Sequence, residues 1–152
     1  MTRRLLPILL IACISLPAAT GCWNKLSEAD VKAAYQRVED LYRSREYDAL
    51  KNLFLPEARI AMIYNGERTE FTVEEYLQHT MTGMRFLTGY EIASNIESIS
   101  LDGKQATVVS TVIESGVMMG EPLNTETRQT AVYAMHKGEI LIRSLTGEVV
   151  LK

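Results

Sequence analysis

The second half of the chain carries the feature that most constrains its fold, a series of β-type segments joined by short turns. Asp102-Gly103 and Lys137-Gly138 each separate two such segments, and a pair of this kind between β-type segments favours a tight hairpin. This half of the sequence therefore predicts an antiparallel meander of four strands. The predicted strands are Tyr90–Leu101, Lys104–Ser115, Asn124–His136 and Ile140–Leu151.

Two details of this meander are predicted from its glycines. Gly116–Pro122 is expected to form the loop between the second and third strands, with Met118 and Met119 exposed on it. Gly147 is expected to mark a bulge in the last strand, since an isolated glycine within a strand pattern is typical of one.

The first half of the mature chain carries helix signals. Ser27-x-x-Asp30 and Thr72-x-x-Glu75 are capping boxes, in which two side chains satisfy free backbone N–H groups at a helix start. Apolar residues then recur at helical spacing from Val31 to Tyr42. Two long helices are therefore expected, one after each box.

A short helix and a hairpin are predicted between the two long helices. The short helix starts near Tyr47, and Pro56 is expected to end it. Asn65-Gly66 then joins strand Ala58–Tyr64 to strand Glu67–Phe71. With the meander, this order predicts an α+β domain in which three helices pack on a curved, mostly antiparallel sheet of about six strands.

Residues 1–21 are predicted to be a signal peptide that is removed from the mature protein. Arg3 and Arg4 precede an apolar run, and small residues follow it. The run is shorter than the roughly 20 apolar residues that a spanning helix needs. The segment Ala19-Thr20-Gly21-Cys22 resembles the bacterial lipobox, which implies that Cys22 is lipidated and becomes the first residue of the mature chain.

The charge of the mature chain bears on its partners. Residues 1–21 contain two of the 16 basic residues and none of the 19 acidic ones, so their removal leaves a net charge of −5. We expect no nucleic-acid binding, and anionic lipid repels such a chain. Acyl chains on Cys22 would hold it to a membrane of the bacterial envelope, facing the periplasm. Residues 22–26 would form a short tether, about 15 Å long, before a domain at residues 27–152.

The element order and one segment carry a family resemblance. Tyr47-Asp48-Ala49-Leu50-x-x-Leu53-Phe54-x-Pro56-Glu57-Ala58 joins helix to strand, and with the element order it resembles the nuclear transport factor 2-like superfamily over residues 26–150. The resemblance implies a cone-shaped domain, also described as a cystatin-like roll, with a pocket at its open end. It further implies a homodimer through the sheet. Apolar residues on both faces of one strand agree with this: Val108, Val109, Val112 and Ile113.

The enzymes of this superfamily imply where a site would lie. Aligned with the ketosteroid isomerases on Leu53-Phe54, the chain has Val38 and Met62 where those enzymes have a tyrosine and a carboxylate base. Ala131 stands where they have a second acid. Tyr64 and Tyr133 are expected to line the same cone. A pocket of this composition binds an apolar ligand without proton transfer.

Three functions remain open from the sequence. The first is the binding of a small apolar ligand or a protein partner without catalysis. The second is an enzyme of dehydratase or polyketide-cyclase type, with His79 or Glu114 as the acid–base group in the pocket. The third is a structural or assembly role in an envelope complex. Glu75 and His79 are spaced as a helix pair, but no third ligand follows at metal-site spacing, so no metal and no cofactor is expected.

Overall fold

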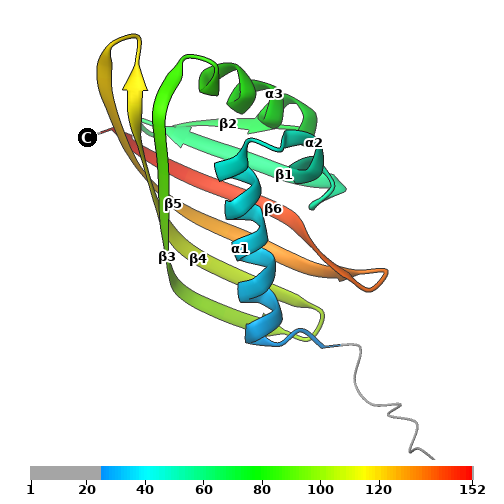
Figure 1. Ribbon diagram of the computed structural model, residues 1–152. Helices are drawn as coiled ribbons and strands as arrows, with labels where there is room; N and C mark the ends of the chain where they lie inside the picture. The colour runs from blue at the N-terminus through cyan, green and yellow to red at the C-terminus, as the bar shows by residue number, and fades with distance from the viewer. Residues whose placement is uncertain (1–24, 152) are drawn as a thin grey trace, which may run out of the picture.

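The computed structural model describes residues 25–151 and has the predicted α+β architecture. Three helices pack on one six-stranded sheet, and the order of elements is the predicted one. Figure 1 shows α1 crossing one face of the sheet, with α2 and α3 gathered near one end of it. The elements are α1 Glu28–Ser44, α2 Tyr47–Lys51, β1 Phe54–Tyr64, β2 Glu67–Phe71, α3 Val73–Met84, β3 Leu87–Asp102, β4 Gln105–Met118, β5 Glu121–His136 and β6 Glu139–Leu151.

Both predicted capping boxes are present. The Ser27 hydroxyl accepts a hydrogen bond from the backbone N–H of Asp30, and the Asp30 side chain accepts one from the Ser27 backbone. Thr72 and Glu75 make the same reciprocal pair at the start of α3. These bonds satisfy backbone donors that have no partner within the helix, and so they fix where each helix begins.

The strand order is β2-β1-β6-β5-β4-β3, so the last strand of the meander pairs with the first strand of the domain. β1 and β6 run parallel, and all other neighbours are antiparallel. Register shifts interrupt the pairing of β3 with β4 near Ile96 and that of β5 with β6 near Val132. Irregularities of this kind bend strands, which agrees with the curvature of the sheet around α1 in Figure 1.

The predicted end of the second helix is wrong. α2 ends at Lys51, and Leu53 and Phe54 have already left it. Pro56 lies within β1, where the β1–β6 pairing skips from Phe54 to Arg59. A proline has no N–H to give to a neighbouring strand, so it is tolerated at such an irregularity.

Two predicted details of the meander are also wrong. β4 continues to Met118 and β5 begins at Glu121, so the expected loop is a two-residue turn at Met119-Gly120, with both residues at positive φ. Gly147 pairs regularly with Met62 and Gln129. A Cβ at Gly147 would lie 2.9 Å from Met62 Cε, so a larger residue there would require the Met62 side chain to shift.

The hydrophobic core extends from the start of α1 along the sheet to α2 and α3, and it is most closely packed where the start of α1 meets the sheet. Val31 of α1 and Val108 of β4 are fully buried there, and Tyr133 of β5 is almost so. Leu26 packs into the same cluster, and its N–H donates to Gly103 O. No helix in residues 25–151 is long and apolar enough to cross a membrane.

Candidate functional site

A cavity of about 570 Å³ lies between α1, α3 and the concave face of the sheet. All five residues predicted to line a pocket form part of its wall: Val38, Met62, Tyr64, Ala131 and Tyr133. His79 and Glu114, the acid–base candidates of the enzyme alternative, also lie in the wall. The structure thus brings both predicted sets together in one place.

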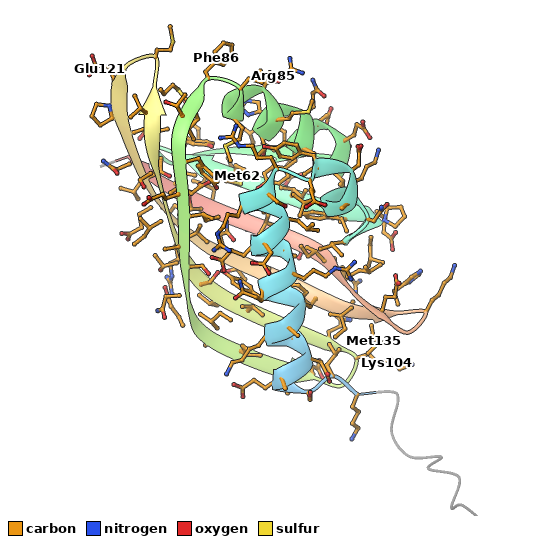
Figure 2. All side chains as sticks on the ribbon, viewed as in Figure 1. Met62, Arg85, Phe86, Lys104, Glu121 and Met135 are labelled. Atoms are coloured by element: carbon orange, nitrogen blue, oxygen red, sulfur yellow. The ribbon has the colours of Figure 1, made fainter. Side chains whose placement is uncertain are left out.

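The cavity lies toward the end of the domain opposite the start of α1, and core residues such as Tyr133 and Ile142 form part of its wall. Figure 2 shows Lys104 and Met135 beside the start of α1, at the packed end, and Phe86 and Glu121 at the opposite end. Met135 N–H donates to Lys104 O, which closes the packed end. Val38 lies seven residues after the buried Val31 on α1, two helical turns further along the same side.

Two partly buried phenols meet in the cavity wall. The Tyr42 hydroxyl of α1 donates to the Tyr76 hydroxyl of α3 over 2.7 Å. Burial raises the pKa of Tyr76 to about 12, and burial together with Tyr76 raises the pKa of Tyr42 well above its ordinary value. Both phenols are therefore neutral in the physiological range, where they can donate and accept hydrogen bonds but cannot act as bases.

A single carboxylate lies among the tyrosines. The Tyr90 hydroxyl donates to Glu114 Oε1 over 2.7 Å. Burial raises the pKa of Tyr90, and the nearby negative charge of Glu114 raises it further. Burial raises the pKa of four other tyrosines, and the charge of Glu114 adds a smaller increase: Tyr42, Tyr47, Tyr64 and Tyr76.

The second carboxylate of the wall, Glu39, has its own partners. Arg43 forms an ion pair with Glu39 over 2.8 Å, one turn along α1. The Ser94 hydroxyl of β3 donates to the other Glu39 oxygen over 2.9 Å. These contacts compensate the charge of Glu39 within the protein.

His79 lies at the exposed edge of the cavity and packs against an aromatic ring. Its ring centroid is 5.9 Å from that of Phe71. Glu75, the predicted helix partner of His79, instead accepts hydrogen bonds from the Thr72 backbone and hydroxyl, and these bonds lower its pKa. Within residues 25–151, no group of three or more potential ligands is arranged to hold a metal ion.

Three phenols of the site were not among the residues predicted to line the pocket. Tyr42 and Tyr76 lie in its wall, and Tyr90 donates to the wall residue Glu114. A signal was present, because Tyr42 follows Val38 by four residues and so lies on the same helix face. Cys22, the predicted lipidation site, lies outside the described residues.

The comparisons with solved structures agree with this architecture. A conserved protein from Planctomyces limnophilus superposes with a TM-score of 0.73 at 15% identity, covering 82% of this chain and 97% of that protein. An NTF-2 like protein of unknown function from Silicibacter pomeroyi superposes with a TM-score of 0.61 at 16% identity, covering 82% of this chain and 100% of that protein. A hexachlorocyclohexane dehydrochlorinase from Novosphingobium barchaimii superposes with a TM-score of 0.67 at 11% identity, covering 82% of this chain and 87% of that protein. At these identities the likeness concerns the fold.

The fold and the cavity define the class of protein. The domain has the nuclear transport factor 2-like fold that the sequence resemblance predicted. More narrowly, residues 27–117 match the model of a family described as "Putative lumazine-binding". That match spans more than half of the chain, and the protein belongs to this family. No curated protein sequence matches it.

Proposed function

We propose that this domain binds a small, largely apolar ligand in the cavity and does not transform it. The cavity of about 570 Å³ carries the proposal, since pockets for small molecules fall in the range of about 300–1,000 Å³. Apolar side chains such as Val38 and Met62 supply burial, which contributes about 25 cal/mol per Å². Tyr64 and the Tyr42–Tyr76 pair would orient the ligand through their hydroxyls.

The family description supplies a first ligand class to test. Lumazine is a flat, two-ring heterocycle with ring N–H and carbonyl groups, and the wall offers aromatic faces and neutral hydroxyls that suit such a ring. Phe54 and Tyr76 meet edge to face, with ring centroids 6.5 Å apart, within this wall. A flat ring placed beside this pair would gain aromatic contacts as well as burial.

Filling the cavity tests the proposal. Titration calorimetry with lumazine, and with uncharged phenyl-substituted alcohols, should show saturable binding to the wild type. Val38→Trp should abolish it, because the indole would occupy the cavity. Val117→Trp is the matched control, since Val117 is exposed at the end of β4 and is absent from the wall. If no compound binds, or if Val38→Trp binds as the wild type does, the cavity is not the site.

We further propose that acyl chains on Cys22 anchor the protein to a membrane of the bacterial envelope, facing the periplasm. α1 begins at the packed end of the domain, beside Lys104 and Met135 (Figure 2). An anchor just before α1 would therefore hold the packed end toward the membrane. The cavity, at the other end, would then take its ligand from the aqueous side.

The anchoring proposal has a direct test. Cys22→Ser should block lipid attachment and release the protein from membranes, whereas Ser27→Ala, a few residues along, should leave fractionation unchanged. A Cys22→Ser protein that is processed normally and stays equally membrane-bound would contradict the anchor.

A homodimer through the outer face of the sheet is also proposed. Val108 and Val112 are buried toward the helices, whereas Ile113 is 51% exposed on the opposite face of β4. A second copy would cover Ile113 and the neighbouring Val109. Sedimentation of the domain without Cys22 should show a dimer at tens of micromolar (a concentration typical of moderate affinity), and Ile113→Lys should dissociate it. A wild-type monomer under these conditions would refute the dimer.

Catalysis is the second candidate, and His79 carries it. His79 and Glu114 line one cavity, and one similar fold belongs to a dehydrochlorinase. Binding ranks first because Glu114 already accepts a hydrogen bond from Tyr90 and the His79 ring packs against Phe71 in a tilted arrangement. His79→Ala should therefore leave ligand affinity nearly unchanged. If the wild type eliminates water from a hydroxylated carbonyl compound and His79→Ala does not, the protein is an enzyme.

A further inference from the structure

The cavity wall carries two carboxylates, Glu39 and Glu114, and none of its residues is a lysine or an arginine. Its one histidine, His79, lies at the exposed edge. An apolar cavity with low-dielectric walls strengthens the field of any charge that it contains. An anionic ligand would therefore meet repulsion in this cavity, and a cationic one attraction.

The two carboxylates differ in how far the protein compensates them. Glu39 is paired with Arg43 and accepts a hydrogen bond from Ser94. Glu114 accepts a hydrogen bond from the neutral Tyr90 phenol. Among residues 25–151, no basic nitrogen lies within ion-pair distance of Glu114. A partly buried carboxylate without a cation is costly, and a bound cation would remove that cost.

Aromatic rings line the same cavity as Glu114. Tyr42, Tyr64 and Tyr76 line the cavity and lie close enough for the charge of Glu114 to raise their pKa values. Phe54 and Phe71 add two further rings to the wall. The faces of such rings attract organic cations, so they would support the head group that Glu114 attracts.

We infer that the ligand class is an organic amine, with its ammonium group at Glu114 and its apolar body along the wall formed by Val38 and Met62. The ammonium would donate to the Glu114 oxygen that Tyr90 does not occupy and would contact the ring faces. This inference rests on the proposed function, because it names the ligand of the same cavity. It adds a requirement for positive charge that the family description does not contain.

Three compounds of the same length test the requirement: 4-phenylbutylamine, 4-phenylbutanol and 4-phenylbutyrate, which are cationic, neutral and anionic at neutral pH. Titration calorimetry on the full-length protein should give the tightest binding for the amine, about tenfold tighter than for the alcohol. The butyrate should bind most weakly. Glu114→Gln should lower the affinity for the amine to that for the alcohol. The affinity of this variant for the alcohol should stay within about twofold of the wild-type value.

The outcomes separate the two proposals. Glu121→Gln is the matched control, since Glu121 is the first residue of β5 and lies exposed (Figure 2). This variant should keep the amine preference. If the alcohol binds as tightly as the amine, or if Glu114→Gln keeps the preference, the amine inference fails and the cavity proposal stands. If none of the three compounds binds, both fail. A Glu114→Gln protein that still binds the alcohol is folded, so its loss of amine preference cannot reflect unfolding.

Discussion

The two ends of the domain share the same helix and the same strands, yet one end is packed and the other is hollow. At the packed end, Val31 and Val108 are fully buried and Ala106 is 1% exposed. At the open end, the continuations of α1 and β4 place Val38 and Glu114 on a cavity. The difference lies in which side chains face inward, since the backbone elements run through both ends.

The inward side chains of β5 show the change most clearly. Tyr133 and Ala131 belong to the core and also border the cavity, whereas further toward the start of the strand the wall residues are polar: Gln129, Thr127 and Thr125. Polar side chains of moderate size leave space and tolerate water, which large apolar side chains do not. The comparison shows that the same helix and strands form a closely packed core near the start of α1 and the wall of a cavity further along.

The largest expected effect comes from placing a charge at equivalent positions on α1. Val31→Asp should abolish cooperative folding, because an unpaired buried carboxylate costs several kcal/mol against a total stability of about 5–15 kcal/mol. Val38→Asp, two turns along, should remain folded because its carboxylate reaches the cavity. Thermal unfolding followed by circular dichroism measures both. Equal loss of structure in the two variants would remove the distinction between the ends.

The second largest effect is expected at alkaline pH, which should lower the free energy of unfolding through the tyrosines of the open end. The fold raises the pKa of Tyr76 from 10.0 to about 12, so its contribution is complete below pH 10 and is lost as pH rises through 12. The shift corresponds to about 2–3 kcal/mol. Urea unfolding at pH 10 and at pH 12 should show this loss in the wild type and a smaller one in Tyr76→Phe. An equal loss of unfolding free energy in the wild type and in Tyr76→Phe would mean that water reaches this phenol freely.

Shortening one valine at each end of β4 should give a smaller, graded effect. Val108→Ala should cost about 2 kcal/mol, because it removes buried methyl groups and leaves a new void in the core. Val112→Ala should cost about half as much, since Val112 already borders a cavity. Urea denaturation gives both values. A larger cost at Val112 would show that the open end is packed as tightly as the core.

The smallest expected effect is at the phenol pair. Tyr42→Phe removes the donor to Tyr76 and should cost about 1 kcal/mol or less, because water in the cavity can replace it. A double-mutant cycle with Tyr76→Phe isolates the coupling between the two hydroxyls. A coupling energy well above that of an ordinary hydrogen bond would mean that the pair is sealed from water.

The sequence predicted the fold well because its signals are local. Capping boxes at Ser27 and Thr72 set the helix starts, and Asn65-Gly66 set a hairpin whose second strand has the predicted bounds. The end of α2 was missed, because Pro56 favours a helix stop and a strand irregularity equally well in sequence. The long-range pairing of β1 with β6 carries no local signal at all.

The candidate site was predictable only in part, and for a physical reason. The positions of Val38, Met62 and Ala131 came from the family resemblance, and their place in the wall follows from the shared fold. The environment of Glu114 could not be predicted in this way, because it depends on how side chains from α1, α3 and β3 meet in space. Spacing within one element places a residue on a face, but it does not show which other elements meet that face.

One measurement tests the central claim, that the open end binds ligand and the packed end does not. Methyl NMR spectra of the protein, recorded with increasing 4-phenylbutanol, report on both ends at once. We predict saturable shifts of the Met62 and Val112 methyl signals, which border the cavity, while those of Val31 and Val108 stay unmoved. Shifts confined to exposed methyl groups such as Val117 and Ile113, with Met62 and Val112 unmoved, would contradict the account.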